Sequence, residues 1–260
     1  MIAEVTELLL SQLVLFVLVL TRLSTLLLAM PAVGVGVPMR VRALLAISLT
    51  VLLLPIVGRQ VDGVAEPAMD NLIELATAIA REAMVGLLIG TVVQLLVTGL
   101  QLAGEVASNT GSMQLGDGAD PTTRANVPTL ARLIGLLVTA LFVVLGGHRL
   151  LLQALLDSFD SLAPGHVSFH EGMLDLVVHE LVSGIQAGIR LSAPVVTALL
   201  LSNLVTGFIS RTLPGLNVLA IGLNINALVI LIVSSLALGS VTWIFSQELS
   251  EALQRLRETW

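Results

Sequence analysis

The chain has 260 residues, of which 56% are hydrophobic and only 12% are charged, and its mean hydropathy is +1.00. Soluble proteins carry about a quarter charged residues, so this composition excludes an ordinary soluble domain and indicates a membrane protein. A net charge of -6 without any arginine cluster argues against nucleic-acid binding, and the lack of cysteine excludes disulfides, thiolate metal sites and cysteine nucleophiles.

Six apolar stretches are candidates for membrane-spanning helices: 8–30, 43–57, 84–104, 133–147, 191–209 and 216–245. A helix needs about 20 apolar residues to cross a bilayer, so the second and fourth stretches are short and the last can hold a bend or a hairpin. The arginines divide almost equally between alternate loops, so they give no orientation. We predict an all-α integral membrane protein. Either these span boundaries are wrong, or some helices do not thread the bilayer as simple spans.

Two further segments are amphipathic. Residues 67–81 place polar and apolar side chains on opposite faces of a helix. The C-terminal tail does the same, and Glu251 stands four residues before Arg255, a spacing that supports a helix. The apolar face of this tail consists of Leu249, Leu253, Leu256 and Trp260. We predict that both segments lie on a surface or against a partner helix.

A polar stripe runs along one face of the third apolar stretch. Its members follow one another at steps of three or four residues: Thr91, Gln94, Thr98, Gln101 and Glu105. Polar side chains at membrane depth usually face a bundle interior or a water-filled cavity. The stripe therefore predicts either residues that line a channel or residues that form hydrogen bonds between packed helices.

Arg22 lies in the middle of the first apolar stretch. A guanidinium group in lipid costs several kcal/mol unless it is paired or reaches water. Glu105 and Asp120 are candidate partners. The alternative is that the membrane boundary is near and the side chain extends to it.

Two glycine pairs have the spacing that lets helix backbones approach closely. They are Gly86 with Gly90 and Gly184 with Gly188. We predict that both pairs serve helix packing.

A polar, glycine-rich loop separates the third and fourth apolar stretches. Such a loop between apolar helices suits a moving part, and we predict that it forms a plug over a passage. The predicted plug comprises Gly111, Ser112, Met113, Gln114, Leu115, Gly116, Asp117, Gly118, Asp120 and Pro121.

Motifs for chemistry are lacking. The His179-Glu180 pair departs from the zinc-protease pattern, because Ser183 stands where the second histidine belongs. His166 and His170 follow a Pro-Gly pair, which is more typical of a solvated loop than of a metal site. The sequence has no complete dinucleotide, phosphate-loop or serine-hydrolase motif. We predict no catalytic residue, no cofactor and no metal.

Several motifs taken together resemble the FliR family of flagellar export-gate proteins and its injectisome counterpart, SctT. Arg22, Glu82, Gly86 and Gly90 fit this resemblance, as do segments near residues 31–55 and 211–222. The central motifs are Ala103-Gly104-Glu105, Gly111, Asp120-Pro121, residues 127–132, Leu141-Phe142, Gly147-His148 and residues 158–165.

The resemblance implies a chain built of helical hairpins, with a FliP-like part at about 1–165, a plug loop near 111–127 and a FliQ-like part at about 166–260. It implies that one copy joins FliP and FliQ subunits, beside other membrane proteins of the export apparatus. Together they would form a gate for unfolded flagellar proteins at the flagellar basal body in the bacterial inner membrane. The alternatives are an injectisome export gate, or a secondary transporter for a small solute that uses Arg22, Glu105 and Asp120. Internal repeats are common in such transporters, and we find none here.

Overall fold

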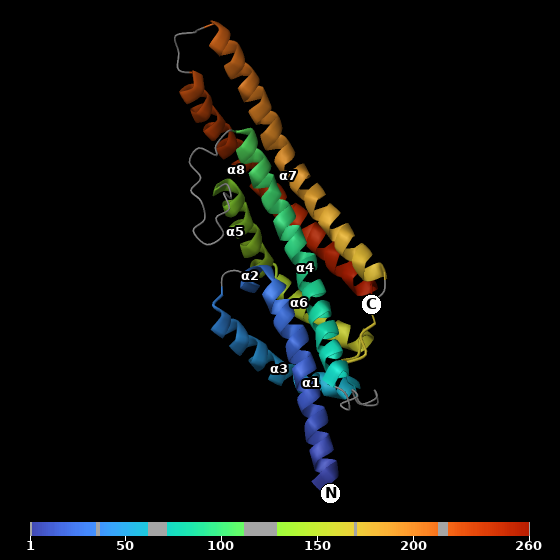
Figure 1. The fold of residues 1–260 in the computed structure, drawn as a ribbon. Helices are drawn as coiled ribbons and strands as arrows, with labels where there is room; N and C mark the ends of the chain where they lie inside the picture. Colours follow the sequence, from blue (N-terminus) through green and yellow to red (C-terminus); the bar gives the residue numbers. More distant parts are fainter. Residues whose placement is uncertain are drawn as a thin grey trace. The chain divides into compact units, whose positions relative to one another are not determined.

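The computed structural model describes residues 2–34, 37–61, 72–111, 129–168, 171–212 and 218–259. These residues form eight α-helices and no strand, which confirms the predicted all-α class (Figure 1). In chain order the helices are α1 (Ile2–Ala29), α2 (Pro31–Gly34), α3 (Met39–Val61), α4 (Leu72–Thr110), α5 (Thr129–Val144), α6 (Gly147–Ser161), α7 (Glu171–Thr212) and α8 (Val218–Glu258).

The described part of the chain holds four candidate membrane spans, or six if each bent pair of helical segments is one span. The four straight candidates lie in α1, α3, α4 and α7. Leu130–Val144 meets Gly147–Ser161 at 64°, and Ile221–Ala237 meets Gly239–Glu258 at 52°. The first bend falls at Gly146, whose φ of 74° is a left-handed conformation that glycine adopts without strain. The six predicted stretches thus correspond to these segments, and the last one contains a bend.

The amphipathic segment 67–81 is helical where it is described, as the sequence predicts, but it is continuous with the apolar stretch that follows. From Leu72 onward it forms the beginning of α4, which continues without a break to Thr110, while residues 67–71 lie outside the described residues. Neither glycine nor proline occurs between Leu72 and Met84, so no residue there favours a helix end. The change from an amphipathic to an apolar pattern therefore occurs within one continuous helix.

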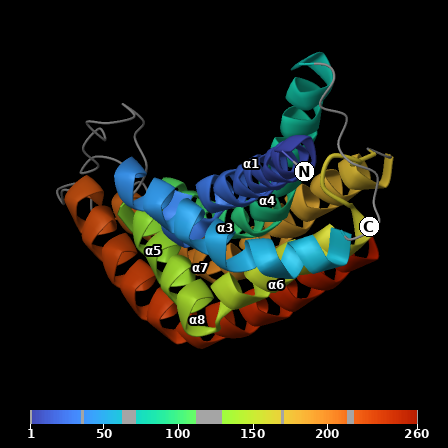
Figure 2. The same cartoon turned by 90° about the horizontal axis from the view of Figure 1, so that it is seen from below.

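The helices divide into two compact units. Unit 1 comprises Met1–Gln94, Phe142–Glu180 and Leu249–Trp260. Within it α3 lies beside α1 and also contacts α6 (Figures 1 and 2). Its core contains fully buried side chains from α1, α4 and α6, among them Leu18, Leu26, Ile89, Leu155 and Phe159.

The C-terminal end of α8 is fastened within unit 1 by apolar and ionic contacts. Leu249, Leu253 and Leu256 are buried, so the apolar face of the predicted tail packs against protein. The Arg255 Nε atom donates to Glu180 on α7 at 2.6 Å, and Arg257 pairs with Asp157 on α6 at 3.2 Å. The predicted pair between Glu251 and Arg255 is confirmed at 3.4 Å.

Unit 2 comprises Leu95–Leu141 and Leu181–Glu248. Its core includes Ala107, Val195, Leu199 and Ile230, from α4, α7 and α8. An apolar cavity of about 760 Å³ lies among α4, α5, α7 and α8 in this unit. The predicted division at about residue 165 rests on the family resemblance and stays a prediction.

Candidate functional site

Arg22 is completely buried, and every polar atom of its guanidinium group has a partner. Its Nε atom donates to the Glu82 carboxylate on α4 at 2.5 Å. Nη1 donates to the carbonyl and the hydroxyl oxygens of Ser158 at 3.1 and 3.0 Å, and Nη2 donates to the carbonyl of Leu162 at 3.0 Å. The group also lies over the Phe159 ring, 4.3 Å from its centroid. Arg22 thus caps the end of α6: it binds the carbonyl of Leu162 and adds a second donor to the carbonyl of Ser158, which already accepts from the Leu162 N–H at 2.9 Å.

Glu82 completes this buried ion pair from the other side. Its side chain is fully buried, and its second carboxylate oxygen accepts a hydrogen bond from the Gly165 N–H at 2.9 Å. Gly165 has a φ of 84°, which suits the turn that presents this N–H. The four groups together, Arg22, Glu82, Ser158 and the turn at 162–165, connect α1, α4 and α6. We call this set the buried ion-pair node.

The partner of Arg22 differs from the prediction. The sequence suggested Glu105 or Asp120, but the structure pairs Arg22 with Glu82, and Asp120 lies outside the described residues. The idea that Arg22 extends to water is also wrong, because the side chain is fully buried. The signal for Glu82 was a carboxylate four residues before Gly86, on the face that approaches α1.

Gly86 and Gly90 lie where α4 meets α1. A Cβ atom at Gly86 would come closer than 3.0 Å to the carbonyl oxygen of Arg22, and one at Gly90 would overlap Ala29. Residues 82, 86 and 90 share one face of α4 because they are four apart. The two glycines therefore let α1 approach to the distance at which Glu82 reaches Arg22.

Gly184 and Gly188 lie at a second close approach, between α7 and α4. A Cβ atom at either position would come within 3.0 Å of α4 backbone atoms, those of Leu95 and Gly99 respectively. A Cβ atom at Gly99 would in turn overlap the backbone of Gly184. Sequence reasoning missed Gly99, although its spacing of four from the small residue Ala103 was a signal.

The polar stripe of α4 has mixed surroundings. Thr91 donates to the carbonyl of Leu88 in its own helix at 3.0 Å, and Gln94 and Thr98 also make polar contacts. The amide of Gln101 lies against α5, because a Cβ atom at Gly135 would overlap it. Glu105 is half-buried. At Gln101, therefore, the stripe serves contact between helices.

Most of the predicted plug, residues 112–121, lies outside the described residues. Only Gly111 is described. It is buried, its N–H donates to the carbonyl of Ala107 at 3.0 Å, and its own carbonyl accepts from Asn226 Nδ2 at 3.3 Å.

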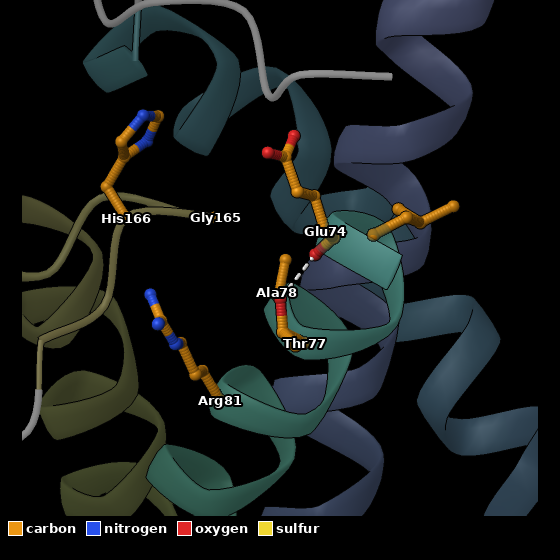
Figure 3. Close-up of a pocket in the computed structure, with 7 residues that line it drawn as sticks. Glu74, Thr77, Ala78, Arg81, Gly165 and His166 are labelled. Carbon is orange, nitrogen blue, oxygen red and sulfur yellow. Dashed lines mark hydrogen bonds between the residues drawn. The ribbon is translucent and has the colours of Figure 1, made fainter. Parts of the chain in front are cut away.

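A cavity of about 310 Å³ with a mixed polar and apolar lining lies in unit 1 beside the buried ion-pair node. Figure 3 shows Arg81 extending from α4 toward the loop that carries His166, with Glu74 about two turns earlier on α4. Arg81 Nη1 donates to the carbonyl of Val167 at 3.4 Å. No group of three His, Asp or Glu side chains suited to a metal ion occurs among the residues that the structure describes. His170 lies outside them.

Comparison with known proteins identifies the family. The model of a family described as bacterial export proteins, family 1, matches residues 13–252. The chain belongs to this family. It is 24% identical over 237 residues to the flagellar biosynthetic protein FliR of Caulobacter vibrioides, an alignment that covers 91% of this chain and 93% of that protein.

Two other FliR proteins are similar over shorter alignments. The FliR of Escherichia coli is 27% identical over 142 residues, which cover 55% of this chain and 54% of that protein. The FliR of Bacillus subtilis is 25% identical over 180 residues, which cover 68% and 70%. The predicted FliR family is thus confirmed, and this chain is a membrane-bound subunit of a flagellar export apparatus.

Proposed function

We propose that this FliR-family chain is a single-copy, non-catalytic subunit of a flagellar export gate in the bacterial inner membrane. In this proposal it joins several FliP and FliQ subunits at the basal body, beside other membrane proteins of the apparatus. Together they form the channel through which unfolded flagellar proteins leave the cell. The likeness to FliR proteins along nearly the whole chain is the observation that carries the proposal.

The exposed surfaces of α3 and α7 support a role inside an assembly. Apolar side chains on α3 such as Leu44 and Leu52 are exposed, and so are Leu201, Leu204 and Phe208 on α7. Such surfaces require lipid or the apolar helices of other subunits to cover them. A chain surrounded by unlike subunits would cover them with protein.

The interior of unit 1 supports a rigid structural role rather than transport of a solute. Arg22 and Glu82 satisfy each other and are closed off from water. A charge that binds and releases a solute must exchange partners, whereas each nitrogen of Arg22 already has a fixed acceptor. In this proposal unit 1 is a rigid part of the gate, and any gating movement occurs in other segments.

For the channel itself, we propose that the part of α4 with Gln94 and Glu105 borders the passage and that residues 111–121 close it, whereas Gln101 packs against α5. The polar stripe and the FliR likeness support this assignment. Deletion of residues 112–120, which spares Gly111, should make the membrane permeable to ions. Membranes that stay ion-tight with normal amounts of the variant would contradict the plug.

The single-copy claim has a direct test. Two versions of the chain with different affinity tags are produced in one cell, and one tag is used to purify gently extracted complexes. We expect FliP and FliQ to co-purify and the second tag to be absent. Recovery of both tags in one complex would contradict a single copy.

A further inference from the structure

A cluster of side-chain amides surrounds the C-terminal end of α4 in unit 2. Asn226 Nδ2, on α8, donates to the carbonyl of Gly111 at 3.3 Å and to Asn203 Oδ1, on α7, at 2.8 Å. Asn203 Nδ2 donates to the carbonyl of Thr110 at 3.3 Å, and Ser202 Oγ donates to Asn226 Oδ1 at 2.8 Å. Three helices thus meet in one hydrogen-bond network.

The network satisfies carbonyl groups that a helix leaves free. The last four carbonyls of any α-helix have no partner within the helix and need water, a cap or another group. Here the carbonyl of Thr110, the last residue of α4, and that of Gly111, the next residue, receive N–H groups from other helices. Asn226 and Gly111 are buried, so water cannot easily replace this amide.

Apolar packing next to the network is incomplete. The cavity of about 760 Å³ is lined by Ala107, one turn before Gly111, and by Ala227 and Ile230 of α8. An open cavity offers this part of α4 no packing partner on that side, so the directed hydrogen bonds contribute more to its attachment.

We propose that Asn226, Asn203 and Ser202 act as an interhelical clamp, which fixes the C-terminal end of α4 to α7 and α8. By holding the carbonyls of Thr110 and Gly111, the clamp fixes the position of these two residues against α7 and α8. These three are positioning residues for that helix end. The inference goes beyond the proposed export role, since it concerns the chain's own helices and does not depend on which subunits surround it.

Amide hydrogen exchange on the full chain, purified with the membrane proteins that accompany it, tests the clamp. Asn226→Leu keeps the size of the side chain but removes both N–H donors. We expect amides in residues 107–111 to exchange about tenfold faster, because hydrogen bonds to a buried carbonyl are lost. Amides in residues 92–100, in the middle of α4, serve as the internal reference and should not change.

Two further variants keep the test decisive. Asn203→Ala changes an exposed residue, so folding is preserved, and it removes the bond to Thr110 and the bond from Asn226. It should speed exchange in residues 107–111, and little should be added when it is combined with Asn226→Leu, because both belong to one network. Asn224→Leu, at an exposed site on the same helix, is the matched control and should have no effect.

Exchange in residues 107–111 that stays within twofold of the parent chain in Asn203→Ala and Asn226→Leu would overturn the clamp. An equal increase in residues 92–100 would also overturn it, since that result shows general loosening. Absence of FliP and FliQ from the purified parent chain would instead count against the proposed function, and the exchange pattern of α4 distinguishes the two failures.

Discussion

Removal of one member of the buried ion pair should destabilise the chain strongly. Glu82→Ala leaves the Arg22 guanidinium buried, with three remaining hydrogen bonds but no counter-charge. Breaking such a pair costs about 3–5 kcal/mol, because the remaining charge cannot be solvated. At roughly 2–4 °C per kcal/mol for a chain of this size, the unfolding midpoint should fall by about 6–20 °C.

A double-mutant cycle measures the interaction energy between Arg22 and Glu82 apart from the other contacts of each side chain. Arg22→Met alone leaves the Glu82 carboxylate buried with the Gly165 N–H as its remaining donor among the described residues. The combination of Arg22→Met with Glu82→Leu removes both charges and should be less destabilising than either single change. The exposed pair of Arg257 and Asp157 is the control, and Arg257→Ala should cost at most about 1 kcal/mol.

The assay is thermal unfolding of the purified complex in detergent. The amount of chain that stays soluble after heating is measured at each temperature. We expect the unfolding midpoint of Glu82→Ala to fall by about 6 °C or more. A midpoint within about 2 °C of the parent protein would refute the importance of the ion pair. So would a double variant whose loss equals the sum of the two single losses, since that outcome means that the two charges do not interact.

Other predictions concern helix contacts and the C-terminal end. Gly86→Val should separate α1 from α4 and lower the amount of chain in membranes several-fold on immunoblots, whereas Gly207→Ala, in open space, should leave the amount unchanged. Arg255→Ala should release the end of α8 and increase its cleavage by protease, because the buried Glu180 loses its partner. High salt should reproduce little of that effect, since Glu180 is shielded from solvent. A large effect of salt would show that the contact is open to water.

Much of the helix content follows from hydrophobicity alone. Long apolar stretches without polar breaks have few alternatives to a helix in a membrane, so their existence and order were predictable. The boundaries of the helices are harder to predict. The change from an amphipathic to an apolar pattern near Arg81 suggests a boundary between two helices, yet no residue there ends a helix, and α4 continues through it.

The partners of buried polar groups could not be predicted. Because an unpaired charge inside the membrane is costly, the sequence predicts that Arg22 has a partner. That this partner is Glu82, 60 residues away, depends on how α1 crosses α4. The same holds for Asn226, which the sequence places in an apolar stretch and the structure places against Gly111. Periodicity identifies the face of a helix, whereas tertiary packing decides what that face meets.

The most direct test of the proposed assembly is the mass of the intact complex, measured by native mass spectrometry after gentle extraction from membranes. The account predicts one copy of this chain bound to several copies of FliP and FliQ. A stable particle made of this chain alone, whether a monomer or a homo-oligomer, that supports export in vesicles would contradict it.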